Sequence, residues 1–211
     1  MVLFIESVGN IEMIKNIIFD VGKVLVEVRW LEVMQELGFD ETTVDLVANA
    51  TVCSSVWGEY DRSRLPYQDM LTRFIMNNPK VEKEIRLFME HEKKAIREFP
   101  YAREWVKSFR DKRYKCYVLS NYPKRTLENT REERSFEEFL NGAVYSCQVQ
   151  MIKPEKEIYQ ILLEQYDLIA EECVFIDDNQ ANVKMARKLG IHAVHFRSKG
   201  EAEKELAKLG L

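Results

Sequence analysis

The chain lacks any CxxC pair among its four cysteines. Three of them, Cys116, Cys147 and Cys173, lie in apolar, strand-like runs, a setting that favours buried, reduced thiols. Reduced thiols are typical of a reducing cytosol rather than of a secreted protein. We therefore expect a cytoplasmic protein.

Long apolar runs and an excess of basic charge are also absent. No run approaches the length of a membrane span, and the opening MVLFIESVGN has no basic start of the kind a signal peptide needs. The formal net charge of -4 does not indicate nucleic acid or anionic lipid as a partner. We expect no membrane and no nucleic acid partner, and nothing in the pattern selects between a monomer and a dimer.

What the sequence does contain is an alternation of short apolar strands and amphipathic helices from residue 99 onward. Trp105, Val106 and Phe109 have helical spacing ahead of the strand-like run YKCYVLSN. The run ECVFIDD is followed by a helix for which Asn179 is the predicted N-cap and Gly190 the predicted C-terminal stop. Strands that are apolar throughout are buried on both faces, as in a parallel sheet covered by helices.

Residues 28–98 differ, because they carry helical periodicity and no convincing strand. Val81, Ile85 and Phe88, for example, fall at i, i+4 and i+7. The sequence therefore predicts an α/β protein: a doubly wound, Rossmann-like parallel-sheet core from residues 15–27 and 99–211, with an all-helical cap inserted at residues 28–98. Residues 1–14 are predicted to be an N-terminal extension.

Six polar residues stand at strand ends or just before a predicted helix: Asp20, Ser120, Asn121, Lys153, Asp177 and Asp178. Open α/β sheets bind ligands at the carboxyl ends of their strands, where loops and helix N-termini converge. Asp20 could attack phosphorus to form an aspartyl-phosphate. Mg²⁺ held by Asp20 and the Asp177–Asp178 pair would reduce the repulsion between carboxylate and phosphate. Ser120 and Lys153 would hold the equatorial phosphate oxygens.

Four segments, FDVGKVL, VLSN, IKPEKEIY and VFIDDNQANVKMARKLGI, resemble in order and spacing the four motifs of the haloacid dehalogenase superfamily. The resemblance covers residues 15 to 196, and the helical insert is similar to the type I cap of that superfamily. It implies a Mg²⁺-dependent phosphatase that acts on a small phosphorylated metabolite through an aspartyl-phosphate intermediate.

The resemblance also implies roles for single residues. Asp20 is the implied nucleophile, and Lys153 the cation that clamps nucleophile and phosphate. The phosphoryl group is implied to be held by Ser120 and Asn121. The implied surroundings of the metal are Asp20, the backbone carbonyl of Gly22, Asp178 as a direct ligand, and Asp177 with Asn182 farther out.

Gly22 departs from the pattern, since most phosphatases of the superfamily have a second aspartate there that protonates the leaving group. The glycine resembles a branch with the FDxGxVL pattern, which includes bacterial α-D-glucose-1-phosphate phosphatase, so a sugar 1-phosphate is the implied substrate. Without an acid at residue 22, the rate should fall as the basicity of the leaving group rises. Glucose 1-phosphate is then expected to react faster than the corresponding 6-phosphate.

Trp57, Tyr60 and Arg62 cluster in the insert, and at least one of them is expected to face the substrate, because a cap that closes over a generic phosphate site sets selectivity. Two other functions are compatible with the fold. One is a non-catalytic or weakly active binding or regulatory protein. The other is a metal-independent 2-haloacid dehalogenase, for which the Asp177–Asp178 pair would be unwanted negative charge.

Overall fold

Five parallel strands form the centre of the protein, in the order β5–β4–β1–β6–β7. The computed structural model describes residues 13–211 and gives the strand bounds as β1 Asn16–Phe19, β4 Lys115–Ser120, β5 Gly142–Tyr145, β6 Cys173–Asp177 and β7 His192–His195. Phe19 of the central strand lies opposite Val118 on one side and Ile176 on the other. The predicted α/β fold with a parallel sheet is confirmed.

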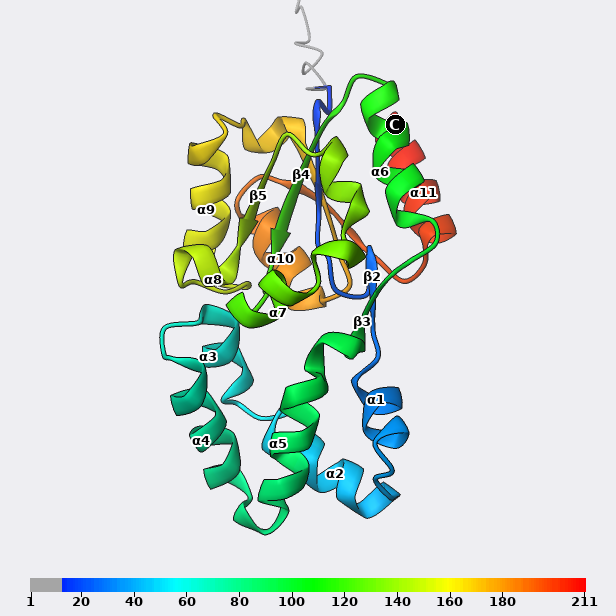
Figure 1. Cartoon of the computed structure of the whole chain (residues 1–211). Coiled ribbons are helices and arrows are strands. Elements are labelled where there is room, and N and C mark those ends of the chain that lie inside the picture. The colour runs from blue at the N-terminus through cyan, green and yellow to red at the C-terminus, as the bar shows by residue number, and fades with distance from the viewer. Residues whose placement is uncertain (1–12) are drawn as a thin grey trace, which may run out of the picture.

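Helices cover both faces of this sheet (Figure 1). Ile17 and Phe19 pack on one face with side chains of α6 and α11, whereas Ile18 packs on the other with side chains of α9 and α10. This alternation along β1 is why Ile17, Ile18 and Phe19 are apolar without interruption. The helices of the core are α6 Ala102–Asp111, α7 Lys124–Asn129, α8 Ser146–Val149, α9 Lys156–Gln165, α10 Gln180–Lys188 and α11 Lys199–Lys208.

Helix α10 begins and ends where the sequence predicts. The side chain of Asn179 accepts a hydrogen bond from the backbone N–H of Ala181, which satisfies one of the free donors at the helix start. Gly190, two residues beyond Lys188, adopts a positive φ of 83°, a conformation that a residue without Cβ reaches at little cost. The loop before α10 is thereby fixed at the end of β6.

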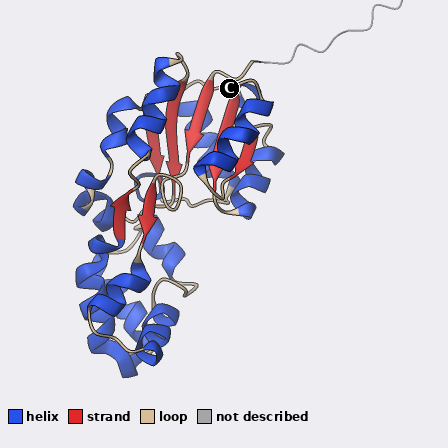
Figure 2. Ribbon diagram, turned by 90° about the vertical axis from the view of Figure 1, so that its right-hand side faces the viewer, coloured by secondary structure: helices blue, strands red, loops and turns tan. Residues whose placement is uncertain are grey.

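The insert lies at the carboxyl ends of the sheet strands, which point toward it (Figure 2). Its helices are α1 Trp30–Glu36, α2 Glu41–Ala50, α3 Trp57–Arg62, α4 Tyr67–Asn77 and α5 Glu82–His91. They bury an apolar cluster of their own, centred on Phe74, Ile85 and Phe88. The ring of Phe74 stacks on Trp57, with 5.7 Å between the ring centroids.

The prediction that residues 28–98 are all-helical is wrong at the two ends of the insert. Strand β2, Val26–Val28, pairs antiparallel with strand β3, Ile96–Glu98, and Val28 lies opposite Ile96. Three-residue strands whose partners are about 70 residues apart leave no local periodicity to recognise. The pair joins the chain entering the insert to the chain leaving it.

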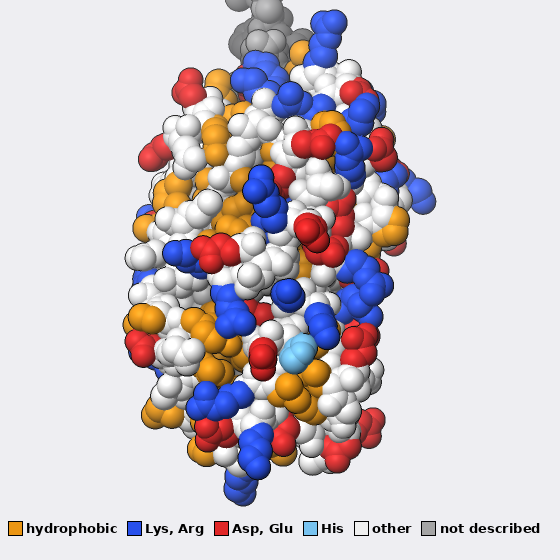
Figure 3. All heavy atoms as spheres, viewed as in Figure 1, with side chains coloured by type: hydrophobic (Ala, Val, Ile, Leu, Met, Phe, Trp, Pro, Cys, Tyr) orange, Lys and Arg blue, Asp and Glu red, His pale blue; other side chains and the backbone are white. Residues whose placement is uncertain are grey.

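The predicted extension, residues 1–14, falls almost wholly outside the described residues. Of the two that are described, Met13 is exposed, whereas Ile14 packs in the core beside Ile17. Among residues 13–211, no helix is long and apolar enough to cross a bilayer. Acidic and basic side chains alternate over the face shown in Figure 3 rather than separating into patches.

The cluster inside the insert predicts a large effect at Phe74, which is fully buried. Phe74→Ala should lower the free energy of unfolding by about 3–5 kcal/mol, because it removes apolar contacts and leaves a cavity. Met76→Ala, on the same helix but 73% exposed, should change it by less than about 0.5 kcal/mol. Urea unfolding followed by circular dichroism measures both, and equal effects would contradict this account of the insert.

Candidate active site

A buried lysine lies between two buried carboxylates at the carboxyl edge of the sheet. The Nζ of Lys153 is 2.8 Å from Oδ1 of Asp20 and 2.7 Å from Oδ2 of Asp177. The ammonium also lies 5.2 Å from the ring centroid of Phe175. Asp20 follows β1 directly and Asp177 ends β6, the neighbouring strand, so the sheet itself brings the two acids together.

Three donors hold one oxygen of the Asp20 carboxylate. Besides Lys153, the Ser120 hydroxyl donates a hydrogen bond of 2.7 Å to Oδ1, and the backbone N–H of Val21 donates another of 2.7 Å. Burial raises the pKa of Asp20 to about 7, Lys153 opposes this rise and the charge of Asp177 adds to it. The orientation of the carboxylate is therefore fixed, and its charge depends on the nearby cation.

Asp177 is held from the opposite side. The Asn182 amide donates to both carboxylate oxygens, at 3.1 and 3.0 Å, and the backbone N–H of Asn179 donates to Oδ1 at 2.7 Å. The Oδ1 of Asn182 is buried and has no hydrogen-bond partner among the residues that the structure describes. Asn182 thus orients Asp177 through its N–H groups.

The three carboxylates at this edge fit a hard divalent cation. Asp20, Asp177 and Asp178 each present a carboxylate oxygen, and these oxygens lie within 4.8 Å of one another. Burial and the charge of Asp177 raise the pKa of Asp178, a strain that a bound cation would relieve. A cluster of carboxylate oxygens is the ligand set that Mg²⁺ prefers.

The Asn121 side chain forms two hydrogen bonds with the backbone of Lys153. Its Oδ1 accepts from the Lys153 N–H at 2.7 Å, and its Nδ2 donates to the Lys153 carbonyl at 3.1 Å. Two bonds to one residue fix the loop that carries the lysine. Asn121 also lines the adjoining cavity, and its contact with a phosphoryl group stays a prediction.

A cavity of about 270 Å³ adjoins this cluster, between the insert and the core. Gly22, Lys23 and Asn121 lie at the end nearest the carboxylates, and Asp61 and Glu92 are its two acidic residues. Most of the remaining wall is apolar, formed by Val26, Val28, Trp30, Val52, Trp57, Phe88, Ala95, Ile96, Tyr122 and Pro123. The cavity therefore offers an apolar surface next to a strongly polar one.

The three residues predicted in the insert separate in the structure. Trp57 lines the cavity, whereas Tyr60 and Arg62 do not. The buried Tyr60 hydroxyl donates to the Glu92 carboxylate at 2.7 Å. Arg62 forms a two-fold hydrogen-bonded ion pair with Glu155 of the core, at 2.7 and 2.5 Å. Both residues thus already have partners inside the protein.

Asp61 is the residue near the site that the sequence analysis missed. It lies on α3 between Tyr60 and Arg62, is 8% exposed and lines the cavity. The available signal was its spacing from Trp57: residues i and i+4 share one face of a helix. A tryptophan and a carboxylate on one helix face are compatible with a wall of a binding cavity.

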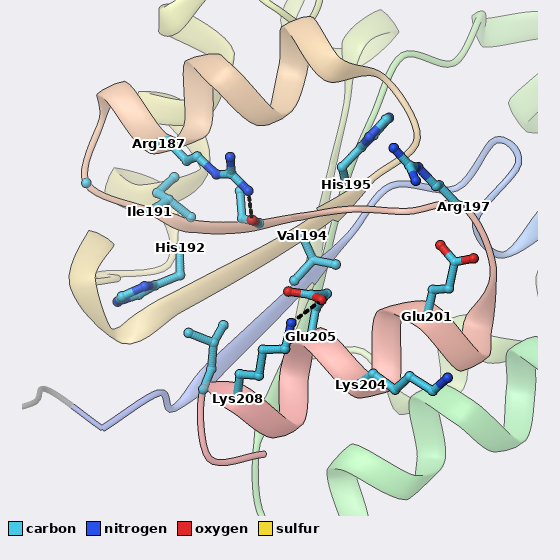
Figure 4. Close-up of a pocket in the computed structure, with 13 residues that line it drawn as sticks. Arg187, Ile191, His192, Val194, His195, Arg197, Glu201, Lys204, Glu205 and Lys208 are labelled. Atoms are coloured by element: carbon cyan, nitrogen blue, oxygen red, sulfur yellow. Dashed lines mark hydrogen bonds and ion pairs between the residues drawn. The ribbon is translucent and has the colours of Figure 1, made fainter.

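A second hollow, of about 760 Å³, lies along α10, β7 and α11 and contains none of these residues (Figure 4). Two of its cations have partners within it: Arg187 donates to the carbonyl of Ala193 at 2.7 Å, and Lys208 pairs with Glu205 at 2.5 Å. It is a weaker candidate despite its size, because none of the buried carboxylates at the strand ends reaches it.

Replacing the buried lysine should reveal how much free energy it costs to bury two carboxylates without a cation. In metal-free protein, Lys153→Met should lower the free energy of unfolding by about 3–5 kcal/mol at pH 8, since two buried acids lose their cation. The exposed Lys156→Met is the control and should be neutral.

The pH dependence follows from the pKa of Asp20, which is about 7 when folded against the usual 3.8. Because the unfolded chain ionises at lower pH than the folded protein, the free energy of unfolding falls as pH rises from about 3.8 to about 7. Without Lys153 the pKa of Asp20 in the folded protein rises further, so the free energy of unfolding continues to fall at higher pH. The deficit of Lys153→Met should therefore grow as pH rises above about 7. Unfolding in urea with a chelator measures this, and a deficit equal at pH 6 and pH 9 would contradict it.

Comparisons with known proteins agree on one family. The model of the haloacid dehalogenase-like hydrolases matches residues 57–196. A phosphorylated carbohydrates phosphatase of Thermotoga maritima is 27% identical over 170 residues, which cover 69% of this chain and 79% of the relative. A sesquiterpene phosphatase of Aspergillus oryzae is 24% identical over 86% of this chain and 89% of its own. Other relatives are longer proteins, of which this chain spans 30% and 12%.

Among solved structures, a HAD family enzyme of Bacteroides thetaiotaomicron in complex with magnesium and inorganic phosphate has the same fold. It aligns with a TM-score of 0.68 at 22% identity, over 88% of this chain and 96% of the other. The family model spans about two thirds of the sequence and includes Ser120, Lys153 and the Asp177–Asp178 pair. The chain belongs to the haloacid dehalogenase-like hydrolases.

Proposed function

We propose that this hydrolase is a Mg²⁺-dependent phosphatase that acts on a small phosphorylated metabolite through an aspartyl-phosphate on Asp20. The observation that carries the proposal is the Asp20 carboxylate itself, held by Ser120 and Lys153 beside two further carboxylates. A nucleophile, a buried cation and an oxygen-rich cation site within one cluster are what phosphoryl transfer requires.

The residues that would hold Mg²⁺ are Asp20, Asp178 and the backbone carbonyl of Gly22, with Asp177 and Asn182 behind them. When bound, the ion would offset the repulsion between the carboxylates and the phosphate dianion. The residues of the chain supply the remaining chemistry. Lys153 holds Asp20 in place and offers positive charge to the equatorial phosphate oxygens, and Ser120 offers a hydroxyl to the same group.

The same cluster argues against the two alternative functions. A haloacid dehalogenase that works without metal would bind its anionic substrate beside three carboxylates whose oxygens lie within 4.8 Å of one another. A binding protein without hydrolytic activity would have no need for the buried Lys153 between Asp20 and Asp177, an arrangement that is costly to assemble. A phosphatase uses every member of the cluster.

We propose the insert, residues 28–98, as a type I cap that selects the leaving group. Trp57 is the cap residue proposed to contact it, whereas Tyr60 and Arg62 would act indirectly, by positioning Glu92 and by tying the cap to Glu155. The FDxGxVL pattern favours a sugar 1-phosphate, and the name of the Thermotoga relative, a phosphorylated carbohydrates phosphatase, is in line with a sugar phosphate. The apolar cavity wall favours a second candidate, the phosphate of an apolar alcohol, in line with the name of the Aspergillus relative.

Four free cysteines, two of them buried, support a reducing compartment such as the cytoplasm as the place where the protein works.

Hydrolysis of p-nitrophenyl phosphate tests the core proposal. Wild-type protein should turn over with Mg²⁺ and stop with a chelator, and Asp20→Asn should lose at least about 10³-fold because its amide cannot attack phosphorus. The exposed Asp69→Asn is the matched control and should keep full activity. Turnover that survives the chelator or the Asp20 substitution would refute the proposed chemistry.

Selection by the cap predicts a substrate-dependent effect at Trp57. Trp57→Ala should lower kcat/KM about 10- to 100-fold for the preferred member of a panel of sugar 1-phosphates, sugar 6-phosphates and prenyl monophosphates. Acetyl phosphate, too small to fill the cavity, should change by less than about 3-fold. Parallel losses on every substrate would show that Trp57 supports the fold of the cap and not the choice of substrate.

A further inference from the structure

The proposed phosphatase reaction leaves one requirement unmet: a proton must reach the leaving oxygen, and Gly22 has no side chain to provide it. Packing does not impose the glycine, because a Cβ there would meet nothing closer than a methyl group of Val28 at 3.6 Å. We propose that Asp61 of the insert is the general acid and base of this reaction. The inference rests on the proposed function and adds a catalytic residue to it.

The position of Asp61 is the first argument. It lines the same cavity as Gly22 and Asn121, which follow Asp20 and Ser120 in the chain, and as Trp57 of the apolar wall. A phosphate ester with its phosphoryl group at Asp20 and its alcohol in the cavity would place the leaving oxygen between the carboxylate cluster and the residues of the insert. The charges of Lys153 and Asp20 both act on the Asp61 carboxyl, which places it within electrostatic reach of the nucleophile.

The second argument is that Asp61 is a buried residue whose carboxyl has no partner in the part of the chain that the structure describes. Among residues 13–211 it forms no ion pair, and neither carboxyl oxygen takes part in a hydrogen bond. The other acid in the cavity, Glu92, accepts from the Tyr60 hydroxyl and lies 3.3 Å from Arg125. A buried carboxyl normally has donors around it, since burial without them is costly. A ligand in the cavity would supply the contact that Asp61 lacks.

The third argument is that the backbone around Asp61 is held firmly to the core. The Ser146 hydroxyl donates to the Asp61 carbonyl at 2.7 Å and accepts from the Tyr122 N–H at 2.8 Å, so the end of α3 is tied to the loops after β4 and β5. The neighbouring Arg62 is paired with Glu155. Both attachments keep the side chain over the active edge, as acid–base catalysis requires.

The electrostatic environment suits a proton donor. Burial raises the pKa of Asp61 to about 8, an effect that Lys153 and Arg62 oppose and Asp20 reinforces. This shift favours the protonated carboxyl, which is the form that can donate a proton. Arg62 is itself neutralised by Glu59 and Glu155, so it contributes little to holding Asp61 ionised.

In the first step, a carboxylate oxygen of Asp20 forms a bond to phosphorus while the bond from phosphorus to the leaving oxygen breaks. The proton of Asp61 moves to that oxygen, the alcohol departs and Asp61 is left ionised. In the second step, water adds to phosphorus and gives a proton to Asp61, the bond from phosphorus to Asp20 breaks, and inorganic phosphate leaves. Both aspartates then return to their starting states.

A general acid at Asp61 changes the expectation drawn from Gly22 alone, which is that rates fall as the basicity of the leaving group rises. With Asp61 as the acid, rates of the wild-type protein across a series of aryl and alkyl phosphates should depend only weakly on leaving-group basicity. The dependence should become steep when the acid is removed, because only good leaving groups depart unprotonated.

The test is Asp61→Asn, with Asp61→Ala as the second variant and Asp69→Asn as the control with full activity. Alkyl phosphates should react about 10²- to 10⁴-fold more slowly in both Asp61 variants. With p-nitrophenyl phosphate, bond cleavage needs no acid but hydrolysis of the aspartyl-phosphate lacks its base. We therefore expect a burst of one p-nitrophenolate per active site, followed by slow turnover.

Two results would overturn the role of Asp61: unchanged rates in both variants, or the same loss on every substrate with no burst, which is the pattern of a structural residue. Thermal unfolding of each variant shows that it is folded. Failure of the proposed function itself would give a different pattern. The wild-type protein would then show no Mg²⁺-dependent release of phosphate, and Asp20→Asn would have the same activity as the wild type.

Discussion

The arrangement that the rest of this structure depends on is the buried ammonium of Lys153 between the carboxylates of Asp20 and Asp177. An ion buried away from water is tolerable only when its partners are close and well oriented. That requirement fixes three separate segments relative to one another: the end of β1, the end of β6 and the loop before α9. Ser120, Asn121 and Asn182 complete it, each bonding to a member of the ion pair or to its backbone.

Parallel strand pairing is what makes this cluster possible in so short a chain. Adjacent parallel strands end at one edge, so residues about 100 and 157 positions apart from Asp20 arrive beside it without long loops. The insert covers the same edge and is attached there by side chains as well as by β2 and β3. Arg62 with Glu155, and Arg125 with Glu92, are ion pairs between insert and core. These contacts determine which face of α3 meets the cavity.

The proposed chemistry divides between the two parts of the molecule. The core holds the nucleophile, the cation and the carboxylates for a metal, and this set acts on any phosphoryl group. The insert provides Trp57 and Asp61, which line the cavity proposed to receive the group to be released. A proton donor placed on the insert would make cleavage depend on contact between insert and core, so that selection of the leaving group and its departure are coupled.

The sequence by itself determined the sheet, its covering helices and the residues at the strand ends, because continuous apolar runs and helical spacing are local patterns that tertiary structure rarely overrides. The places of Asp20, Ser120, Asp177 and Asp178 were predictable for the same reason, because each ends a strand or follows one directly, and Lys153 lies shortly before α9. Only the tertiary structure decided which segments and side chains of the insert meet these residues and which meet one another. The β2–β3 pair depends on two segments about 70 residues apart, and the partners of Tyr60 and Arg62 come from α5's end and the core. The sequence analysis did not single out Asp61, and only the packing of α3 against the core buries it.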